Sequence, residues 1–292
     1  MVTMTDNDGR RISDMTYEEK KQKLQEQMLV YAQGDMLVAF SGGVDSSLIL
    51  KLAVQAAAKT GHQVYGIMMH TMLHPMGEVE DARVTAEQIG AEFRVLEIDE
   101  LKGADILDNP VDRCYRCKKY LFRNLIEEGE KLGVSVMMEG TNEDDLHVYR
   151  PGLRAIRELG IHSPLAEAGM TKAEVRRLAG ELGVSVSNKP SMPCLATRFP
   201  YGTRISYEAM RKVDEGEAFI RSLGFYNVRL RIHNDVARIE VDVNEMPHLL
   251  EHCEQIVAKL KNLGYDYITC LLYTSDAARR YAVCRSRWSP DQ

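Results

Sequence analysis

The sequence predicts an α/β fold, with a parallel sheet in a first domain and a small α+β domain after it. Short apolar runs alternate with helical segments as far as residue 139, which is typical of βαβ units. A loop rich in glycine and serine joins the first of these runs to a helical segment. From residue 205 the order changes to helix, strand, strand, helix and strand, which indicates a separate unit.

The elements of the first domain follow from hydrophobic periodicity. An amphipathic lead-in helix is predicted over 17–33, where charged residues alternate with apolar ones. Strands are predicted at 36–40, 64–69, 93–98 and 134–139. Helices are predicted at 45–58, 78–89 and 118–131. Helices between parallel strands should cover both faces of the sheet.

The later elements have their own start signals. Thr171 and Glu174 form a capping box for a helix over 171–182. Three prolines in 187–203 predict a long ordered loop or linker. After it come a helix (207–223), strands (227–232 and 236–241) joined by an HND turn, a helix (246–263) and a strand (265–269). We expect an N-terminal helix or extension over 1–34 and domains over 35–204 and 205–269, with an atypical tail over 270–292.

Composition limits the class of protein. The 292 residues are 45% hydrophobic and 27% charged, with a net charge of −6, which is ordinary for a globular protein and gives no basic surplus for nucleic acid. Neither a signal peptide nor an apolar stretch of about 18 residues is present, so we expect a cytoplasmic protein without membrane contact. Six cysteines are too few for a disulfide scaffold, and close spacings among them favour a metal site or catalysis.

The segment SGGVDSS (41–47) follows the first predicted strand. Gly42 and Gly43 let the backbone approach an anion, while Ser46 and Ser47 lie at a helix N-terminus, where unpaired N–H groups favour negative charge. A tight turn with an N-cap is the alternative interpretation. The loop lacks the lysine with which a Walker loop reaches the β- and γ-phosphates, so γ-phosphoryl transfer is poorly supported.

The full segment resembles the signature of the PP-loop ATP pyrophosphatases. This resemblance implies that ATP binds through Ser41, Gly42, Gly43, Asp45, Ser46 and Ser47, and that the loop grips the departing pyrophosphate. The implied chemistry is adenylation of a substrate oxygen, followed by displacement of AMP. Asp45 would help to hold Mg²⁺, because that ion prefers hard oxygen ligands.

Three cysteines are candidates for the displacing chemistry. Cys114 and Cys117 form a C-x-x-C pair at the start of a predicted helix, and Cys194 lies in the proline-rich loop. The pair alone is a weak signal, compatible with a zinc site, a redox pair or chance. Three thiolates suit an iron–sulfur cluster with one exchangeable iron better than a closed zinc site, although zinc completed by a histidine remains an alternative. Cys253 is expected to be a buried small residue.

Four further segments resemble the LarE family: GTNEDDLHVYRPGLRA, HSPLAEAGMTKAEVRRLA, KPSMPCLATRFPYGT and VRLRIHNDVARIE. The similarity covers about 29–269. It implies adenylation of a pyridinium carboxylate on a nicotinate-derived mononucleotide, and then sulfur transfer to give a thiocarboxylate for the nickel-pincer cofactor of lactate racemase. Family members use either a sacrificial cysteine, matched by Cys194, or a three-cysteine [4Fe-4S] cluster. Because Cys114 and Cys117 are present, we expect the cluster, an unidentified sulfide donor and a homo-oligomer such as a hexamer.

The phosphate of such a substrate needs cations outside the ATP site. Arg229 and Arg231 are two residues apart on a predicted strand and so share a face. These two and Arg198 are the candidates, with Glu217 added from the family; the alternative is a solvated strand face. Lys118 and Lys119 should lie near the cluster and the acyl phosphate, but surface lysines are common and they are assigned no role. Three polar residues after a strand end could line the nucleotide pocket or cap the next segment: Asn142, Asp144 and Asp145.

Three rival functions remain, and one segment departs from the family. A tRNA thiolase would need an RNA-binding surface, a non-catalytic nucleotide-binding module would hold a structural zinc, and an ammonia-using synthetase would leave the three cysteines unexplained. The resemblance stops after Thr269, where CLLYTSDAARRYAVCRSRWSPDQ has no clear amphipathic period. We expect that segment to be foreign to the fold and disordered from about Ala277.

Overall fold

The structure is a computed structural model that describes residues 14–71, 73, 78–148, 150–186 and 194–272. The chain forms two compact units. The N-terminal unit comprises Met1–Thr71, Gly77–Glu100 and Cys114–Ser191, and the C-terminal unit comprises Met72–Met76, Leu101–Arg113 and Met192–Gln292. The expected disorder from Ala277 falls outside the described residues.

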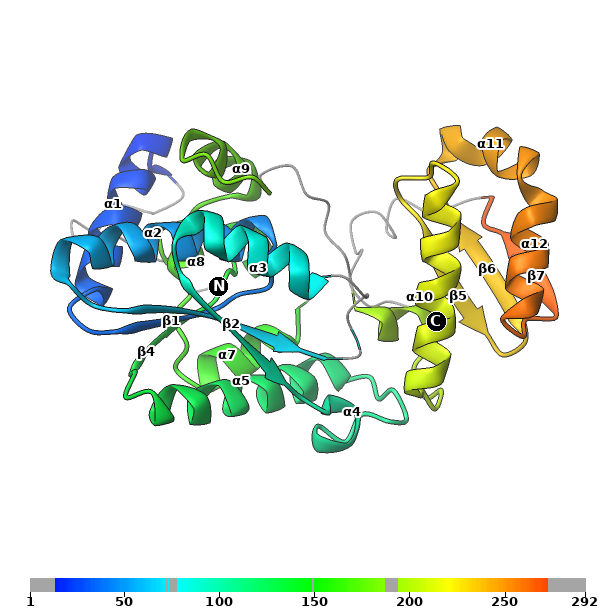
Figure 1. Ribbon diagram of the computed structural model, residues 1–292, viewed down its shortest axis with the longest axis horizontal. Helices are drawn as coiled ribbons and strands as arrows, with labels where there is room; N and C mark the ends of the chain where they lie inside the picture. Colours follow the sequence, from blue (N-terminus) through cyan, green and yellow to red (C-terminus); the bar gives the residue numbers. More distant parts are fainter. Residues whose placement is uncertain (1–13, 72, 74–77, 149, 187–193, 273–292) are drawn as a thin grey trace. The chain divides into compact units, whose positions relative to one another are not determined.

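The N-terminal unit is built on a four-stranded parallel sheet, which confirms the predicted fold class (Figure 1). Its strands are β1 (Met36–Ala39), β2 (Val64–His70), β3 (Glu92–Glu97) and β4 (Val136–Met138), in the order β3-β2-β1-β4. β1 lies between β2 and β4, with Val38 paired to Gly66 on one side and to Met138 on the other. The carboxyl end of β1, where the SGGVDSS loop begins, therefore lies at the centre of the sheet.

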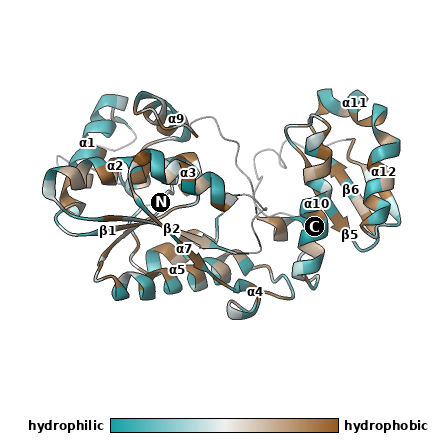
Figure 2. Cartoon of the chain, in the orientation of Figure 1, coloured by the Kyte–Doolittle hydropathy of each residue, from teal (hydrophilic) through white to brown (hydrophobic). Residues whose placement is uncertain are grey.

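Helices cover both faces of this sheet because alternate strand residues point to opposite sides. Met36 and Val38 pack with α2 (Val44–Thr60), α3 (Glu78–Ile89), α9 (Lys172–Glu181), α8 (Pro164–Glu167) and α1 (Tyr17–Tyr31). Leu37 and Ala39 pack with α5 (Arg113–Lys131) and α7 (Gly152–Glu158) on the other face. Figure 2 shows the result on α5, where brown apolar residues alternate with teal polar ones. The short helix α6 (Glu143–Leu146) follows β4.

The lead-in helix α1 is an integral part of the N-terminal unit. Thr16 and Glu19 form a capping box at its start, and Leu24 and Met28 are fully buried in the core. Lys20 is also buried and pairs with Glu174 of α9 at 3.1 Å. The predicted capping box of α9, Thr171 with Glu174, is confirmed. Glu174 thus caps its own helix and holds α1 at the same time.

The C-terminal unit has a three-stranded sheet in the order β5-β6-β7. β5 (Arg229–His233) and β6 (Val236–Glu240) form the predicted antiparallel hairpin, with Asn234 of the turn at φ 56°, and β7 (Tyr267–Cys270) lies parallel to β6. Leu230, Ile239 and Leu260 are buried between this sheet and its helices. The remaining elements are α4 (Glu100–Gly103), η2 (Leu195–Arg198), α10 (Tyr207–Ser222), η3 (Val243–Glu245), α11 (Met246–Glu251) and α12 (Cys253–Asn262).

Several predicted details were wrong. The helix predicted over 246–263 is two helices, since the chain leaves helical geometry at His252 between α11 and α12. Cys253, predicted to be buried, is exposed, because it is the first residue of α12 and the buried positions of that helix, Ile256 and Leu260, come later. Of the proline-rich stretch, 187–193 lies outside the described residues, and η2 was not predicted.

No described helix is both long and apolar enough to cross a membrane.

Candidate functional site

The loop 41–47 is closed by its own serines. Ser46 Oγ donates to Gly43 O at 3.1 Å and lies 3.1 Å from Ser41 Oγ. Gly42 has φ 68°, and a Cβ there would lie 3.1 Å from Cβ of Ala82, so only glycine fits without strain. Gly43 is the N-cap of α2 and provides no side-chain cap. The N–H groups of the first turn of α2 are therefore left for an external anion.

Asp45, the second residue of α2, is held by two side chains from distant parts of the sequence. Its Oδ1 accepts a hydrogen bond from Asn142 Nδ2 at 3.1 Å. Its Oδ2 accepts one from Lys172 Nζ, the first residue of α9. The backbone N–H of Lys172 in turn donates to Asp144 Oδ2 at 2.8 Å. A lysine therefore stands beside the loop, although the segment SGGVDSS contains none.

The residues after β4 fulfil one of the two roles that the sequence left open for them, the capping of the next helix, while their role in a nucleotide pocket stays a prediction. Asn142 is the N-cap of α6 and forms a capping box with Asp145, while its side-chain amide reaches Asp45. Asp144 fixes the start of α9 through its contact with Lys172. The chain after β4 thus caps its own helix and also joins α2 to α9 at the loop.

A buried ion pair lies at the same edge of the sheet. Glu139 directly follows β4, and its Oε2 is 3.2 Å from Lys118 Nζ on α5. Its Oε1 accepts hydrogen bonds from the Thr141 N–H at 3.0 Å and the Ser163 hydroxyl at 2.7 Å. Burial alone would raise the pKa of Glu139, but Lys118, Ser163 and Thr141 together lower it below the usual 4.5. Glu139 is therefore a carboxylate at neutral pH.

The free energy of unfolding should depend on pH through the ionisation of Glu139. Because folding lowers the pKa of Glu139, its contribution to the free energy of unfolding is complete above about pH 4.5 and is lost as the pH falls through the folded-state pKa. Urea unfolding of wild type and Glu139→Gln should therefore differ most at neutral pH and converge in acid. A stability difference that stays constant from pH 7 to pH 3 would contradict this prediction.

The three candidate cysteines are divided between the two units. Cys114 and Cys117 lie in the first turn of α5, three residues apart and thus on one side of the helix, and both are partly buried thiols. Cys194 belongs to the C-terminal unit, immediately before η2. Within the described ranges, no group of three His, Cys, Asp or Glu side chains could hold a metal ion.

The backbone near Cys194 is held by polar contacts. Arg113, the residue directly before Cys114, donates to Ala196 O at 3.1 Å. The Thr197 hydroxyl donates to Cys194 O at 2.7 Å, and Arg231 of β5 donates to Thr197 O at 2.8 Å. The position of Cys194 is thus fixed relative to β5.

Arg198 and Glu217 form a buried pair inside the C-terminal unit. Their side chains are 4% and 1% exposed, and two bonds of 2.7 and 3.1 Å join them. Glu217 also accepts from the Leu230 N–H at 2.9 Å and from Arg221 at 3.3 Å. Glu217 thus accepts hydrogen bonds from Arg198, Arg221 and the Leu230 N–H and holds Arg198 next to β5. The predicted place of Arg198 and Glu217 at the substrate phosphate stays a prediction.

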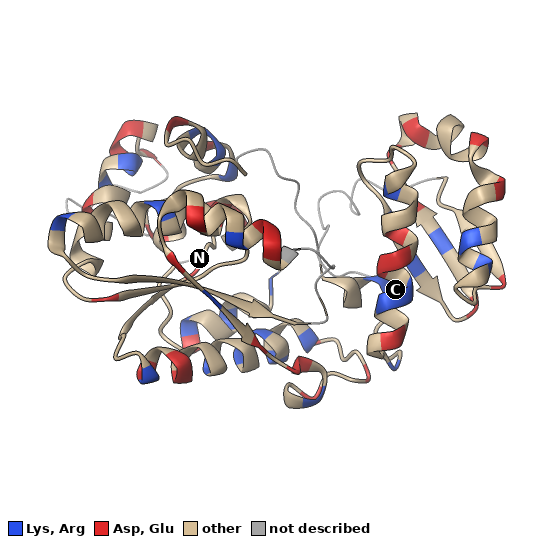
Figure 3. Cartoon of the chain, viewed as in Figure 1, with Lys and Arg blue, Asp and Glu red and all other residues tan. Residues whose placement is uncertain are grey.

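Arg229 and Arg231 share one face of β5, as predicted from their spacing, and the buried Leu230 and Ile232 share the other. The segment η2 contacts the arginine face, where Arg231 donates to Thr197 O. Figure 3 shows basic residues on the neighbouring strands β5 and β6. Arg231 and Arg238 both donate to Glu240 Oε1, at 2.6 and 2.8 Å. Arg229 has neither a hydrogen bond nor an ion pair in the described part of the chain. Burial, then Arg198 and Arg231, lower its pKa. The Arg229 guanidinium is therefore a suitable binding group for an anion.

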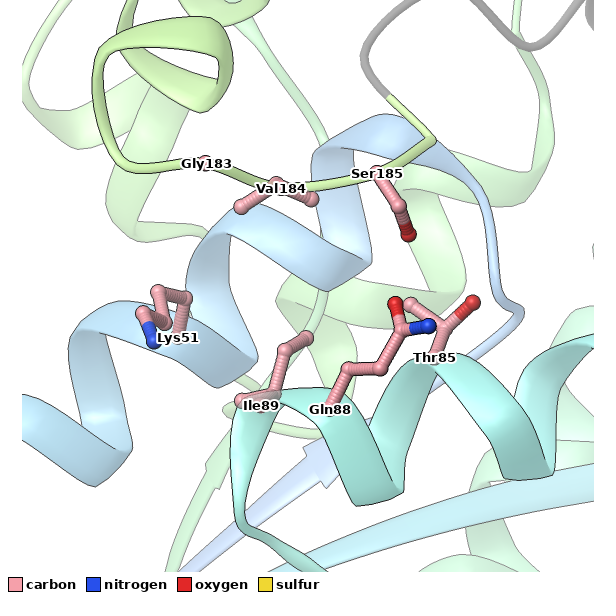
Figure 4. Close-up of a pocket in the computed structure, with 7 residues that line it drawn as sticks. All are labelled: Lys51, Thr85, Gln88, Ile89, Gly183, Val184 and Ser185. Atoms are coloured by element: carbon pink, nitrogen blue, oxygen red, sulfur yellow. The ribbon is translucent and has the colours of Figure 1, made fainter.

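Two cavities lie away from these groups. One of about 20 Å³ between α2, α3 and the loop after α9 is lined by Lys51, Gln88 and Ser185 (Figure 4); it has room for little more than a water molecule. The second, of about 330 Å³, is in the C-terminal unit and is lined by Lys212 and Ile232 among others. Ile232 is on the helix-covered face of β5, so this cavity is separate from the arginine face.

Comparisons with known proteins agree with this geometry. Residues 16–109 match the NAD synthase family. The chain is 36% identical over 232 residues to the pyridinium-3,5-bisthiocarboxylic acid mononucleotide synthase of Lactiplantibacillus plantarum, covering 80% of this chain and 83% of that protein. An uncharacterized protein of Synechocystis is 35% identical over 80% of this chain and 87% of its own. A tRNA-specific 2-thiouridylase of Rickettsia felis is 28% identical, over 54% of this chain and 52% of that enzyme.

The fold and the loop define a PP-loop enzyme that uses ATP. Similarity over four fifths of the chain places it more closely: it belongs to the LarE family of ATP-dependent sulfurtransferases. Sequence reasoning missed two residues of the site, Lys172 and Glu139. Lys172 directly follows the N-cap Thr171, and its place at a predicted helix start was the only sequence signal that could have indicated it. Glu139 could have been noted as an acidic residue ending an apolar strand.

Proposed function

We propose that the protein adenylates a carboxylate of a pyridinium mononucleotide and then replaces AMP with sulfur. The observation that carries this proposal is the first turn of α2. It has no side-chain cap, and Lys172 donates a hydrogen bond to Asp45 within it. Such a site binds a phosphate chain through N–H groups and one movable cation. The Lactiplantibacillus relative is named for its product, a pyridinium-3,5-bisthiocarboxylic acid mononucleotide. The substrate that we propose for this chain is the corresponding dicarboxylic acid mononucleotide.

The proposed first step releases pyrophosphate. A substrate carboxylate oxygen attacks the α-phosphorus of ATP, the new P–O bond forms, and the bond to the β-phosphate bridge breaks with its electron pair. The N–H groups of α2 and the Lys172 ammonium would stabilise the negative charge on the leaving group. Asp45 suits Mg²⁺ by its ligand chemistry. Because Lys172 now occupies one oxygen of Asp45, binding of the magnesium nucleotide would move the lysine from the carboxylate to the phosphates.

The proposed second step forms the thiocarboxylate. A sulfur nucleophile attacks the acyl carbon of the adenylate, the C–S bond forms, and AMP leaves with the electron pair of the C–O bond. The thiol groups of Cys114 and Cys117 fit a metal–sulfur group as two ligands on one side of α5, with Cys194 as the proposed third. The [4Fe-4S] cluster, when bound, supplies the sulfide.

The arginine face of the C-terminal sheet is proposed to bind the substrate phosphate. This face has three guanidinium groups and one carboxylate, which leaves a formal surplus of two positive charges. The groups belong to Arg229, Arg231, Arg238 and Glu240. Burial and the neighbouring arginines lower the pKa of His233, which adds no charge at neutral pH. A surplus of this size matches a phosphate monoester dianion.

Turnover under anaerobic conditions tests the function. The purified protein, MgATP, sulfide and the pyridinium-3,5-dicarboxylic acid mononucleotide should yield pyrophosphate, AMP and a product in which sulfur replaces one carboxylate oxygen, detected by mass spectrometry. If pyrophosphate release required unmodified tRNA instead of the mononucleotide, the proposal would be contradicted and a tRNA thiolase favoured. The chain has similarity to that class of enzyme over about half its length.

Replacing Arg229 should weaken mononucleotide binding selectively. The Arg229→Gln variant is expected to raise the KM for the mononucleotide about 10- to 100-fold, because a charged hydrogen bond contributes about 1.5–3 kcal/mol, while the KM for ATP stays unchanged. Arg204→Gln is the matched control, since Arg204 is 72% exposed and pairs with exposed Asp108 in the same unit. Equal effects of the two substitutions would sink this assignment.

The assembly and the sulfide supply complete the proposal. We retain a homo-oligomer such as a hexamer, a cytoplasmic location and an external sulfide donor. Mass measurement of the native protein in solution tests the first of these, and a monomer at micromolar concentration would refute it.

A further inference from the structure

Two adjacent lysines of α5 have different surroundings. Lys119 pairs with Glu158 at 2.7 Å, and the Glu158 side chain is 32% exposed. Lys118 pairs with Glu139, whose side chain is 7% exposed. The Lys119 pair is on the surface and is screened by water. The Lys118 pair is at the sheet edge and is shielded from solvent on the carboxylate side.

Glu139 connects Lys118 to the loop through the backbone. The residue before it, Met138, pairs with Val38 of β1, and β1 leads directly into 41–47. The residue after it, Gly140, packs so closely on α2 that a Cβ would lie 2.9 Å from the Ser46 nitrogen. Glu139 is therefore fixed at the carboxyl ends of two neighbouring strands, where ligands collect in open α/β sheets.

The Lys118 side chain is confined along its length. A Cβ at Gly152, the first residue of α7, would lie 2.9 Å from Lys118 Cδ, and the Phe122 ring lies 5.6 Å from the ammonium. Glu139 holds the ammonium itself. A lysine normally has many rotamers, and this confinement removes most of them before a ligand arrives.

A second layer of hydrogen bonds supports Glu139. The Ser163 hydroxyl donates to Glu139, and the Ser163 N–H donates to Glu167 Oε1 at 2.8 Å. Glu167 Oε2 in turn accepts from the Tyr31 hydroxyl at 2.7 Å and from Gln27, both on α1. The lead-in helix is thereby connected to the carboxylate that holds Lys118.

We propose that Glu139 is a positioning residue that orients the Lys118 ammonium toward the α-phosphate of the bound nucleotide. This inference rests on the proposed function, because it assumes the adenylation reaction. The role of Glu139 can still be tested by AMP binding alone, without the mononucleotide. Lys119, one residue further on, has no such role because Glu158 holds it on the surface. Glu139 contacts neither phosphate nor substrate and acts only through Lys118.

The test is a double-mutant cycle on AMP binding, measured by calorimetry, and on the pyrophosphate release rate. Glu139→Gln and Lys118→Met are each expected to weaken AMP binding about 10-fold and to lower kcat more than the KM for ATP; the double variant should be no worse than Lys118→Met alone. Ser163→Ala, a milder change, should give a smaller loss of the same kind. Glu158→Gln is the control and should behave as wild type.

Multiplicative losses in the double variant would overturn the inference, as would an equal loss in Glu158→Gln. A Glu139→Gln protein with a lowered unfolding temperature but normal AMP binding would also overturn it, since that would indicate a purely structural role. Failure of the proposed function would look different: wild type would bind AMP with the expected coupling but release no pyrophosphate with the mononucleotide.

Discussion

Replacing Lys172 by methionine is expected to reduce pyrophosphate release about 100- to 1000-fold, the usual effect of removing one charge-stabilising donor from a transition state. Lys172 is the cation bound to Asp45 beside the uncapped start of α2. Removing its charge leaves the pyrophosphate with the backbone N–H groups and the Mg²⁺ ion proposed at Asp45. The backbone N–H of residue 172, which binds Asp144, is untouched by the substitution, so the start of α9 should persist.

The measurement is the initial rate of pyrophosphate release, together with ATP affinity. Lys21→Met is the matched control, because Lys21 forms an ion pair with Glu181 of the same helix α9. We expect the control to retain full activity. If Lys172→Met released pyrophosphate at the wild-type rate, the cation would have to come from elsewhere, and the arrangement around Asp45 would be structural. Asp45→Asn should lower the rate as well, with a raised requirement for Mg²⁺.

The part of the site that is local in sequence could be predicted, and the part assembled by topology could not. Ser41 to Ser47 follow one another in the chain, so their pattern alone indicated the loop. Lys172 is far from Asp45 in sequence, and its contact depends on α9 starting beside the first turn of α2. The capping box predicted where α9 begins, but nothing in the residue pattern stated which strand end lies nearby.

The fold shows the same division. The parallel strands were predicted within a few residues because fully buried strands appear as continuous apolar runs. The break at His252 was missed because the apolar positions of 246–263 fit one helical period, and the interruption of the helix depends on packing in the C-terminal unit. Glu217 carried no local signal of its buried pair with Arg198, since a glutamate on a helix is usually exposed.

Replacing any one of Cys114, Cys117 and Cys194 by serine is expected to abolish iron binding and sulfur transfer. Anaerobically purified wild type should contain about four irons per chain and absorb broadly in the visible range if three thiolates hold a [4Fe-4S] cluster. Pyrophosphate release should survive in the Cys114 and Cys117 variants, because adenylation uses the loop and not the thiols. Loss of metal with retained adenylation is thus the specific signature of this assignment.

Cys253→Ser is the control, since Cys253 is an exposed thiol at the start of α12 and belongs to no proposed site. It should keep both iron and sulfur transfer. Stoichiometric zinc without iron in wild type would exclude the cluster. Mass spectrometry after one turnover then separates the two remaining possibilities: conversion of Cys194 to dehydroalanine would identify it as a single-use sulfur donor, while an unchanged chain would indicate a structural metal.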